Sequence, residues 1–101
     1  MSEYTEQCAL IEWVARCEGR VPELALLLAI PNGEKRDKIT GARLKRAGVR
    51  AGVPDLFLPV ARHGAHGLWI ELKDGGGRTS MAQNRWLRDL ADQGYAVHVA
   101  H

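Results

Sequence analysis

The stretch GVPDLFLPVARHGAHGLWIELK, residues 52–73, decides the fold of this chain because two apolar segments in it flank a turn-rich centre. Residues 55–60 and 68–73 have the length and apolar character of strands, and the glycines and histidines between them favour a turn. We therefore predict a β-hairpin, around which the other elements pack.

Two carboxylates should face each other across this hairpin. We expect its turn at His63 and Gly64, and facing residue numbers then sum to about 126. Asp55 would lie opposite Glu71, with their Cβ atoms roughly 5 Å apart, and side-chain alternation puts Lys73 on the same face. Because two ionised carboxylates at that distance repel each other, a cation should lie between them. Oxygen ligands of this kind suit Mg²⁺ or Mn²⁺.

Helical and strand patterns alternate outside the hairpin. Residues 24–30 are continuously apolar and end in a Pro-Asn-Gly turn, so we predict a buried strand there. Residues 95–100 alternate as a last strand, which a right-handed crossover would make parallel to its neighbour. The expected fold is a mixed α/β sheet with helices packed on it. Apolar spacing and capping residues predict helices at residues 2–18, 40–47 and 81–92.

Length and composition are those of a single domain spanning residues 1–101, with 46% hydrophobic and 26% charged residues. The apolar run at residues 24–31 is far shorter than the roughly 20 residues that cross a bilayer, and no leader pattern opens the chain. Cys8 and Cys17 fall on opposite faces of the first helix, too far apart for a disulfide. We therefore expect no membrane association, reduced thiols and a cytoplasmic location, in a bacterial or phage-infected cell.

Positive charge is concentrated in one segment, although the formal net charge is only +2. Between residues 35 and 50 a single acid, Asp37, accompanies seven basic residues. Such a cluster attracts phosphate groups, and Arg78 is a further candidate contact. The alternative to phosphate binding is that these residues form an ordinary solvent-exposed surface. The basic residues are Lys35, Arg36, Lys38, Arg43, Lys45, Arg46 and Arg50.

The strings GVPD at 52–55 and IELK at 70–73 resemble the Asp…Glu-x-Lys signature of the PD-(D/E)XK nuclease superfamily, and more narrowly the VRR-NUC family. The Asp…Glu-x-Lys spacing alone is weakly specific, whereas its combination with GVPD and a downstream Gln is fairly specific. The resemblance extends over nearly the whole chain. It includes a Glu-bearing first helix, IPNG at 30–33, VRAG at 49–52, Gln83 and Trp86.

This resemblance implies an αβββαβ core of restriction-endonuclease type with a metal-dependent phosphodiesterase site. Asp55 and Glu71 would hold Mg²⁺ or Mn²⁺, helped by the backbone carbonyl of Leu72. Lys73 would orient or activate the attacking water and stabilise charge on the phosphate. Gln83 would contact the site, although it could equally be the last residue of a capping box that starts at Ser80.

Family members usually add a Glu from the first helix, and three candidates are open here. Glu3 lies on the same face as Val14 and can look inward from the first turn, although a first-turn acid also simply favours the helix dipole. Glu6 is the second choice and Glu12 is expected to be solvated. Asn32 is a turn residue on local grounds and a site-lining residue by resemblance.

The tryptophans occupy apolar periodic positions, which favours core packing or a subunit interface over base stacking. These residues are Trp13, Trp69 and Trp86.

The function implied is a structure-selective DNA endonuclease, active as a homodimer that cuts four-way (Holliday) junctions or other branched DNA. The compact chain also fits a phage or mobile-element origin. Two alternatives stay open. One is a non-catalytic nucleic-acid-binding module with structural carboxylates, because Asp55 alone could be a turn residue and Glu71 with Lys73 a solvated ion pair. The other is a metal-dependent hydrolase of small phosphate esters.

Overall fold

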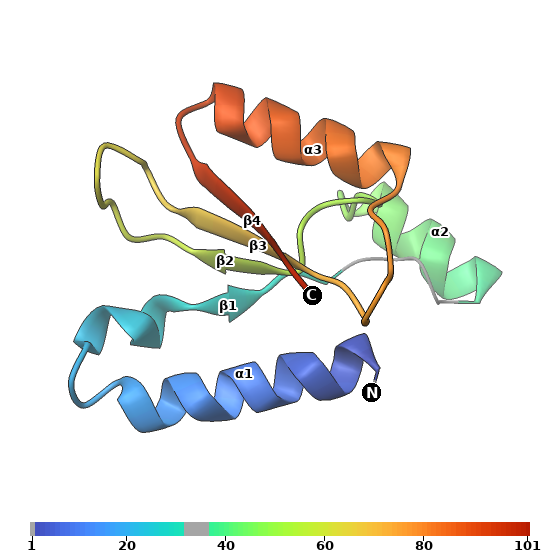
Figure 1. The fold of residues 1–101 in the computed structure, drawn as a ribbon. Coiled ribbons are helices and arrows are strands. Elements are labelled where there is room, and N and C mark those ends of the chain that lie inside the picture. The colour runs from blue at the N-terminus through green and yellow to red at the C-terminus, as the bar shows by residue number, and fades with distance from the viewer. Residues whose placement is uncertain (1, 32–36) are drawn as a thin grey trace.

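The computed structural model describes residues 2–31 and 37–101, so the predicted site residues Asn32, Lys35 and Arg36 lie outside the described residues. Helices and strands alternate in a mixed α/β arrangement, which confirms the predicted fold class (Figure 1). The elements are α1 (Glu3–Cys17), the 3-10 helix η1 (Pro22–Leu26), β1 (Leu28–Ala29), α2 (Lys38–Arg46), β2 (Leu56–Leu58), β3 (Leu68–Leu72), α3 (Met81–Asp92) and β4 (Ala96–Ala100).

The strands of the described residues form one sheet in the order β1-β2-β3-β4, with α1 and α3 on opposite sides (Figure 1). The hairpin has the predicted register, because Leu56 pairs with Ile70 and Phe57 pairs with Trp69. β4 is parallel to β3, as the strand-helix-strand crossover requires. β1 is antiparallel to β2 and forms one edge of the sheet.

The hairpin turn lies at the predicted residues. His63 and Gly64 have φ angles of 50° and 82°, and Arg62 bridges to Ala65 on either side of them. Two successive positive φ angles are typical of the tight turns whose twist matches that of the flanking strands. Glycine adopts this conformation without steric cost.

Residues 24–30 do not form the buried strand predicted from their apolar run. Pro22 begins the 3-10 helix η1, and only two residues then pair with β2. Leu26 and Leu28 keep 53% and 43% of their surface exposed. The run is apolar but lies at the sheet edge, where one strand face and one row of backbone groups lack partners. An apolar run alone does not distinguish an edge position from a central one.

Capping side chains set where each of the three α-helices begins. The Ser2 hydroxyl accepts the Thr5 N–H at 3.1 Å, and the Asp37 carboxylate accepts the Thr40 N–H at 2.9 Å. The Asp37 cap starts α2 at Lys38, two residues earlier than predicted. α3 has the predicted bounds.

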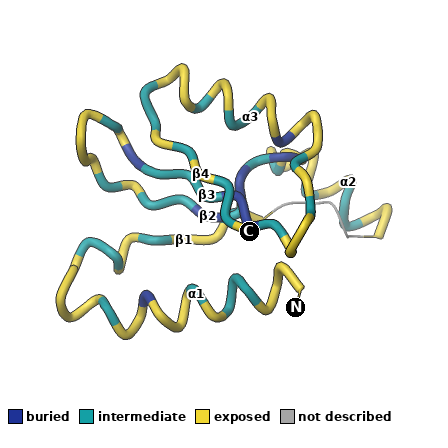
Figure 2. The backbone as a smooth tube through the Cα atoms, in the orientation of Figure 1, coloured by how far each residue is buried: buried dark blue, intermediate teal, exposed yellow. Residues whose placement is uncertain are grey.

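The most buried residues gather at the end of the sheet where β2 begins and β3 ends (Figure 2). Leu56 is fully buried, Leu72 is 6% exposed, and Val14 of α1 packs at 6% exposure. Core packing, one of the two placements predicted for the tryptophans, holds for Trp69 but not for Trp13. Trp69 stacks on Phe57 with ring centroids 4.1 Å apart, whereas Trp13 is 53% exposed.

Neither cysteine of the described chain is in a disulfide. Within residues 2–31 and 37–101, none of the helices combines the length and apolar character needed to cross a membrane.

Gly52 lies in the loop before β2 and packs against α3. We predict that a side chain at this position destabilises the fold. Its φ is +88°, and a Cβ there would lie 3.0 Å from the backbone of Ala82. Gly48 is a matched control, since its φ is +102° but its Cβ would meet nothing within 4 Å. Gly48→Ala should lower the free energy of unfolding by about 1 kcal/mol and Gly52→Ala by about 2–4 kcal/mol. Urea denaturation measures both, and equal losses would contradict the close contact.

Candidate metal centre

Three carboxylates from separate parts of the chain meet at one end of the sheet. Glu3 is the first residue of α1, Asp55 directly precedes β2, and Glu71 belongs to β3. One oxygen of each lies within 4.8 Å of the others. The hairpin register accounts for Asp55 and Glu71, and the direction of α1 across the sheet adds Glu3. Of the three glutamates open as the helix contribution, the structure thus brings Glu3 to the strand carboxylates.

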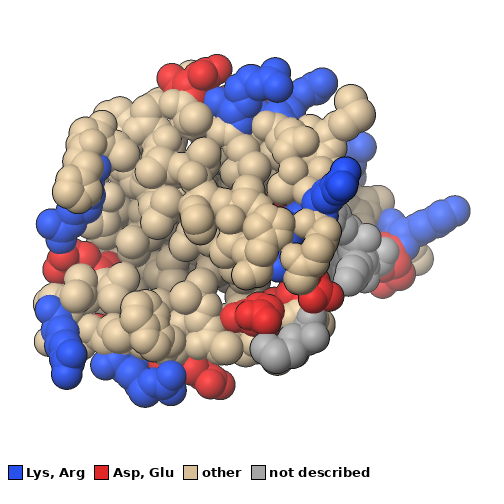
Figure 3. All heavy atoms as spheres, viewed as in Figure 1, with Lys and Arg blue, Asp and Glu red and all other residues tan. Residues whose placement is uncertain are grey.

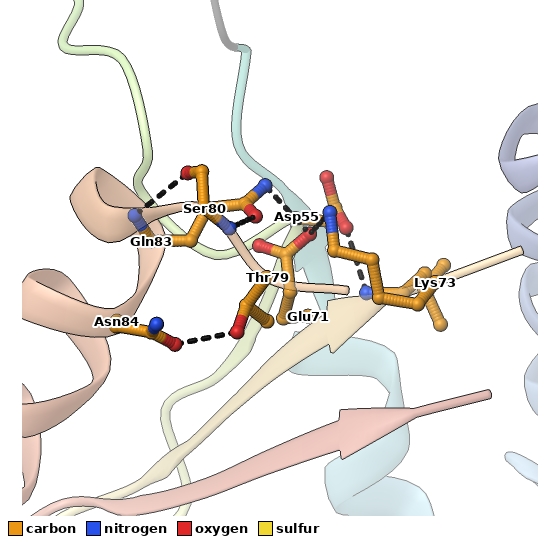
Figure 4. A network of polar contacts seen from close by, with 8 residues as sticks. Asp55, Glu71, Lys73, Thr79, Ser80, Gln83 and Asn84 are labelled. Atoms are coloured by element: carbon orange, nitrogen blue, oxygen red, sulfur yellow. Dashed lines mark hydrogen bonds and ion pairs between the residues drawn. The ribbon is translucent and has the colours of Figure 1, made fainter. Parts of the chain in front are cut away.

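Glu71 is the most deeply buried of these side chains, with 1% of its surface exposed. Its Oε2 accepts the Gln83 side-chain amide at 3.3 Å and lies 3.7 Å from the Lys73 Nζ (Figure 4). Its Oε1 is buried and has no hydrogen-bond partner among the described residues. A buried carboxylate oxygen without a partner is costly, so this atom is suited to carry a proton or to bind a cation.

Burial raises the pKa of Glu71 to about 8, and hydrogen bonding and repulsion from Asp55 add to the rise. The ammonium of Lys73 lowers the pKa, and the charge of Glu3 raises it further. The net effect is that the charged form of Glu71 is disfavoured unless positive charge is added beside it. A divalent cation between the three carboxylates supplies that charge, and hard oxygen donors are the ligands that Mg²⁺ and Mn²⁺ prefer. The residues therefore fit such an ion.

Asp55 is held by the backbone of the opposite strand. Its Oδ2 accepts the Leu72 N–H at 2.8 Å, which places Leu72 directly beside the carboxylates. The peptide of the following residue is held in turn by β4, since the Lys73 N–H donates to the Ala100 carbonyl at 2.8 Å. These main-chain contacts fix the ends of both strands, so the carboxylates are positioned by rigid elements.

Lys73 lies in a largely desolvated position, with 10% of its side chain exposed. Its ammonium is on the same side of β3 as the Glu71 carboxylate, as strand alternation predicts. The arrangement places a positive charge and an ion-binding set of oxygens next to each other. Such a pair can bind and polarise an anionic group.

Gln83 satisfies both roles that its sequence context allows. Its Oε1 accepts the Ser80 N–H at 2.8 Å and its own N–H donates to the Ser80 hydroxyl at 3.1 Å, which completes the capping box. Because Oε1 accepts the Ser80 N–H, the side-chain amide nitrogen of Gln83 faces Glu71 and donates a hydrogen bond to its Oε2 (Figure 4). The first turn of α3 is thereby tied to the carboxylates.

The other predicted site residues that the structure describes belong to α2 and to the loop before α3. Arg78 is exposed in the loop between β3 and α3. Figure 3 shows lysine and arginine side chains over α3 and on the projecting α2, and others on the α1 side of the molecule. The described basic residues of α2 are all exposed: Lys38, Arg43, Lys45 and Arg46.

The sequence identified Ser80 only as the start of a capping box, whereas in the structure it also orients Gln83 toward Glu71. Arg85 was not singled out. Arg85 adds positive charge on α3, and nothing in the sequence distinguishes it from an ordinary exposed residue.

Comparison with known proteins agrees with these features. The family model of the VRR-NUC domain matches residues 2–101. A solved structure described as a VRR_NUC domain protein is 35% identical to this chain and superposes with a TM-score of 0.80. The match covers 99% of this chain and 77% of that chain. None of the curated proteins matches.

The raised pKa of Glu71 predicts a pH-dependent stability in the metal-free protein. Between its ordinary value of 4.5 and about 8, the folded protein keeps a proton on Glu71 that the unfolded chain has lost. The free energy of unfolding should therefore fall as the pH rises through this window. Glu71→Gln should remove that part of the slope. Urea denaturation in EDTA between about pH 5 and pH 8 measures it, and identical slopes in both proteins would contradict the prediction.

Proposed function

This chain belongs to the VRR-NUC domain family, a nuclease-type family, and we propose that it is a metal-dependent endonuclease that cleaves DNA. The observation that carries the proposal is the buried, unpartnered oxygen of Glu71. It belongs to a carboxyl group that clusters with Glu3 and Asp55 and lies beside a desolvated lysine. The proposed catalytic unit is a single domain over residues 1–101.

Glu3, Asp55 and Glu71 would hold Mg²⁺ or Mn²⁺, with the Leu72 carbonyl as a further ligand. When bound, the ion polarises a phosphate oxygen and lowers the pKa of water. Lys73 places its ammonium beside Glu71, where it offsets negative charge that develops on the phosphate and orients the attacking water. Gln83 holds the Glu71 carboxylate through its side-chain amide.

The substrate class follows from the surrounding charge. DNA would be repelled by the carboxylates unless basic side chains held its phosphates near them. Arg78 and the basic residues of α2 supply such contacts, together with Asn32, Lys35 and Arg36 of the preceding segment. We find no base-reading motif, which favours recognition of DNA shape, with four-way (Holliday) junctions as the leading substrate.

A homodimer is proposed as the active form, because a two-fold axis would present two sites to a branched substrate. Support comes from large apolar side chains left in solvent in a chain with a small core. Trp13, Leu26 and Leu28 of α1, η1 and β1 are 53%, 53% and 43% exposed.

The wild-type protein should nick branched DNA only with Mg²⁺ or Mn²⁺. Glu71→Ala and Lys73→Ala should each lower cleavage by at least about 100-fold while DNA binding persists, because they remove the ion site and the adjacent charge. Glu3→Gln should also lower cleavage, whereas Glu12→Gln, exposed on the same helix, should not. Gel assays on four-way, flap, splayed-arm and linear DNA measure this.

Cleavage in EDTA would contradict the proposed chemistry, as would full activity of either alanine variant. DNA binding without cleavage at any metal concentration would favour the non-catalytic binding module. Turnover of small phosphate esters without DNA binding would favour the third alternative.

The dimer predicts a mass of twice 11.2 kDa in light scattering. Trp13→Asp should shift the protein toward monomer, because a charge would replace an apolar side chain at the interface. Ile39→Asp is the matched control on α2, since Ile39 is 70% exposed and should leave the mass unchanged. A monomer at concentrations that support cleavage would contradict the proposed assembly.

A further inference from the structure

A groove of about 800 Å³ separates α2 from α3, and the loop before β2 closes its floor. α2 projects from the side of the molecule and carries no buried residue (Figure 1), so nothing in the described chain fills the space. One face of each helix lines it, since Leu44 and Lys45 of α2 face Arg85 and Trp86 of α3.

The lining combines an apolar floor with a basic rim. Leu44 and Trp86 are half-buried, and Lys45, Arg50 and Arg85 are exposed at the same groove, with Asp89 as the acid among its lining residues. A positively charged groove that contains an aromatic surface is typical of proteins that bind single-stranded nucleic acid. The three basic residues at the rim would add no binding energy to an apolar helix of a partner protein, so a ligand with negative charge fits the groove better.

Trp86 is held in place before any ligand arrives. Its indole N–H donates to the Ala51 carbonyl at 3.1 Å, which fixes the ring against the loop before β2. A base that stacks on a fixed ring costs less ordering than one that stacks on a mobile side chain.

The groove adjoins the carboxylate cluster through the first turn of α3. Ala82 lines the groove, and the next residue, Gln83, contacts Glu71 at 3.3 Å. Gly52 packs against Ala82 and lies in the same loop as Asp55. A strand that leaves the groove past Ala82 therefore arrives at the carboxylates.

We propose that this groove binds a single-stranded segment of the DNA substrate, with a base on Trp86 and phosphates on Lys45, Arg50 and Arg85. The inference rests on the proposed nuclease function, and within branched DNA it favours flaps and splayed arms, which carry an unpaired segment, over the fully paired arms of a four-way junction. A base inside a duplex is stacked on both faces and can reach Trp86 only after it is unpaired and unstacked.

Binding in EDTA tests the groove separately from cleavage. The probes are a labelled oligo-dT and a blunt duplex, followed by fluorescence anisotropy. Trp86→Leu should weaken oligo-dT binding by about 5-fold or more through lost stacking, with little effect on the duplex, and Trp86→Phe should retain most of the affinity.

Charge variants supply a matched comparison on one helix. Arg85→Gln should weaken oligo-dT binding and reduce the slope of log affinity against log salt by about 0.7. Arg88→Gln removes an exposed arginine from the same helix that does not line the groove, and it should leave the slope unchanged. Oligo-dT should also quench tryptophan emission in the wild type more than in Trp86→Phe.

Unchanged oligo-dT affinity in Trp86→Leu and Arg85→Gln would overturn the inference, as would equal losses in Arg85→Gln and Arg88→Gln. A groove variant that halves the mass while retaining oligo-dT binding would overturn it in favour of a second copy of the chain in the groove. Loss of metal-dependent cleavage in Glu71→Ala with unchanged groove binding supports both proposals. If the wild-type protein binds oligo-dT through the groove but cleaves no DNA with any metal, the nuclease function is contradicted and the groove inference is not.

Discussion

The repulsion between buried carboxylates is the constraint on which the rest of the structure depends. Glu71 is 1% exposed and faces Asp55 across the hairpin, with Glu3 close by. A protein that needed only stability would replace such a group with an apolar residue. The surroundings instead reduce its cost, because Lys73 and the Gln83 amide both contact the same oxygen and leave the other free.

Stability and function meet in the first turn of α3. The contacts that cap the helix at Ser80 also determine which atom of Gln83 faces Glu71. Loss of the cap would therefore free the amide to rotate and would change the environment of the carboxylate as well as the stability of the helix. From the sequence, Gln83 could be a capping residue or a residue that contacts the carboxylates. In the structure the same side chain makes both contacts.

Local periodicity was enough to predict the hairpin register and the bounds of α3, because strand alternation and capping residues act within a few positions. Position in the sheet is a non-local property, so the apolar residues 24–30 gave no sign that β1 is a short edge strand. The same limit applies to Trp13, whose exposure depends on how α1 lies on the sheet. Family resemblance implied a helix glutamate and helical spacing made Glu3 the first choice, but only the packing of α1 shows that its carboxylate lies near those of Asp55 and Glu71.

The formal net charge of +2 hides a separation of charge in space. Acidic oxygens converge inside the end of the sheet, while Lys45, Arg50 and Arg85 line an open groove on the other side of Ala82. Basic side chains at the groove attract phosphates, and bare carboxylates repel them. Under the proposed function, a cation bound at the carboxylates would turn that repulsion into attraction. Gln83, which contacts Glu71, and Trp86, which lines the groove, are one helical turn apart on α3, and Gly52 packs against Ala82 beside them.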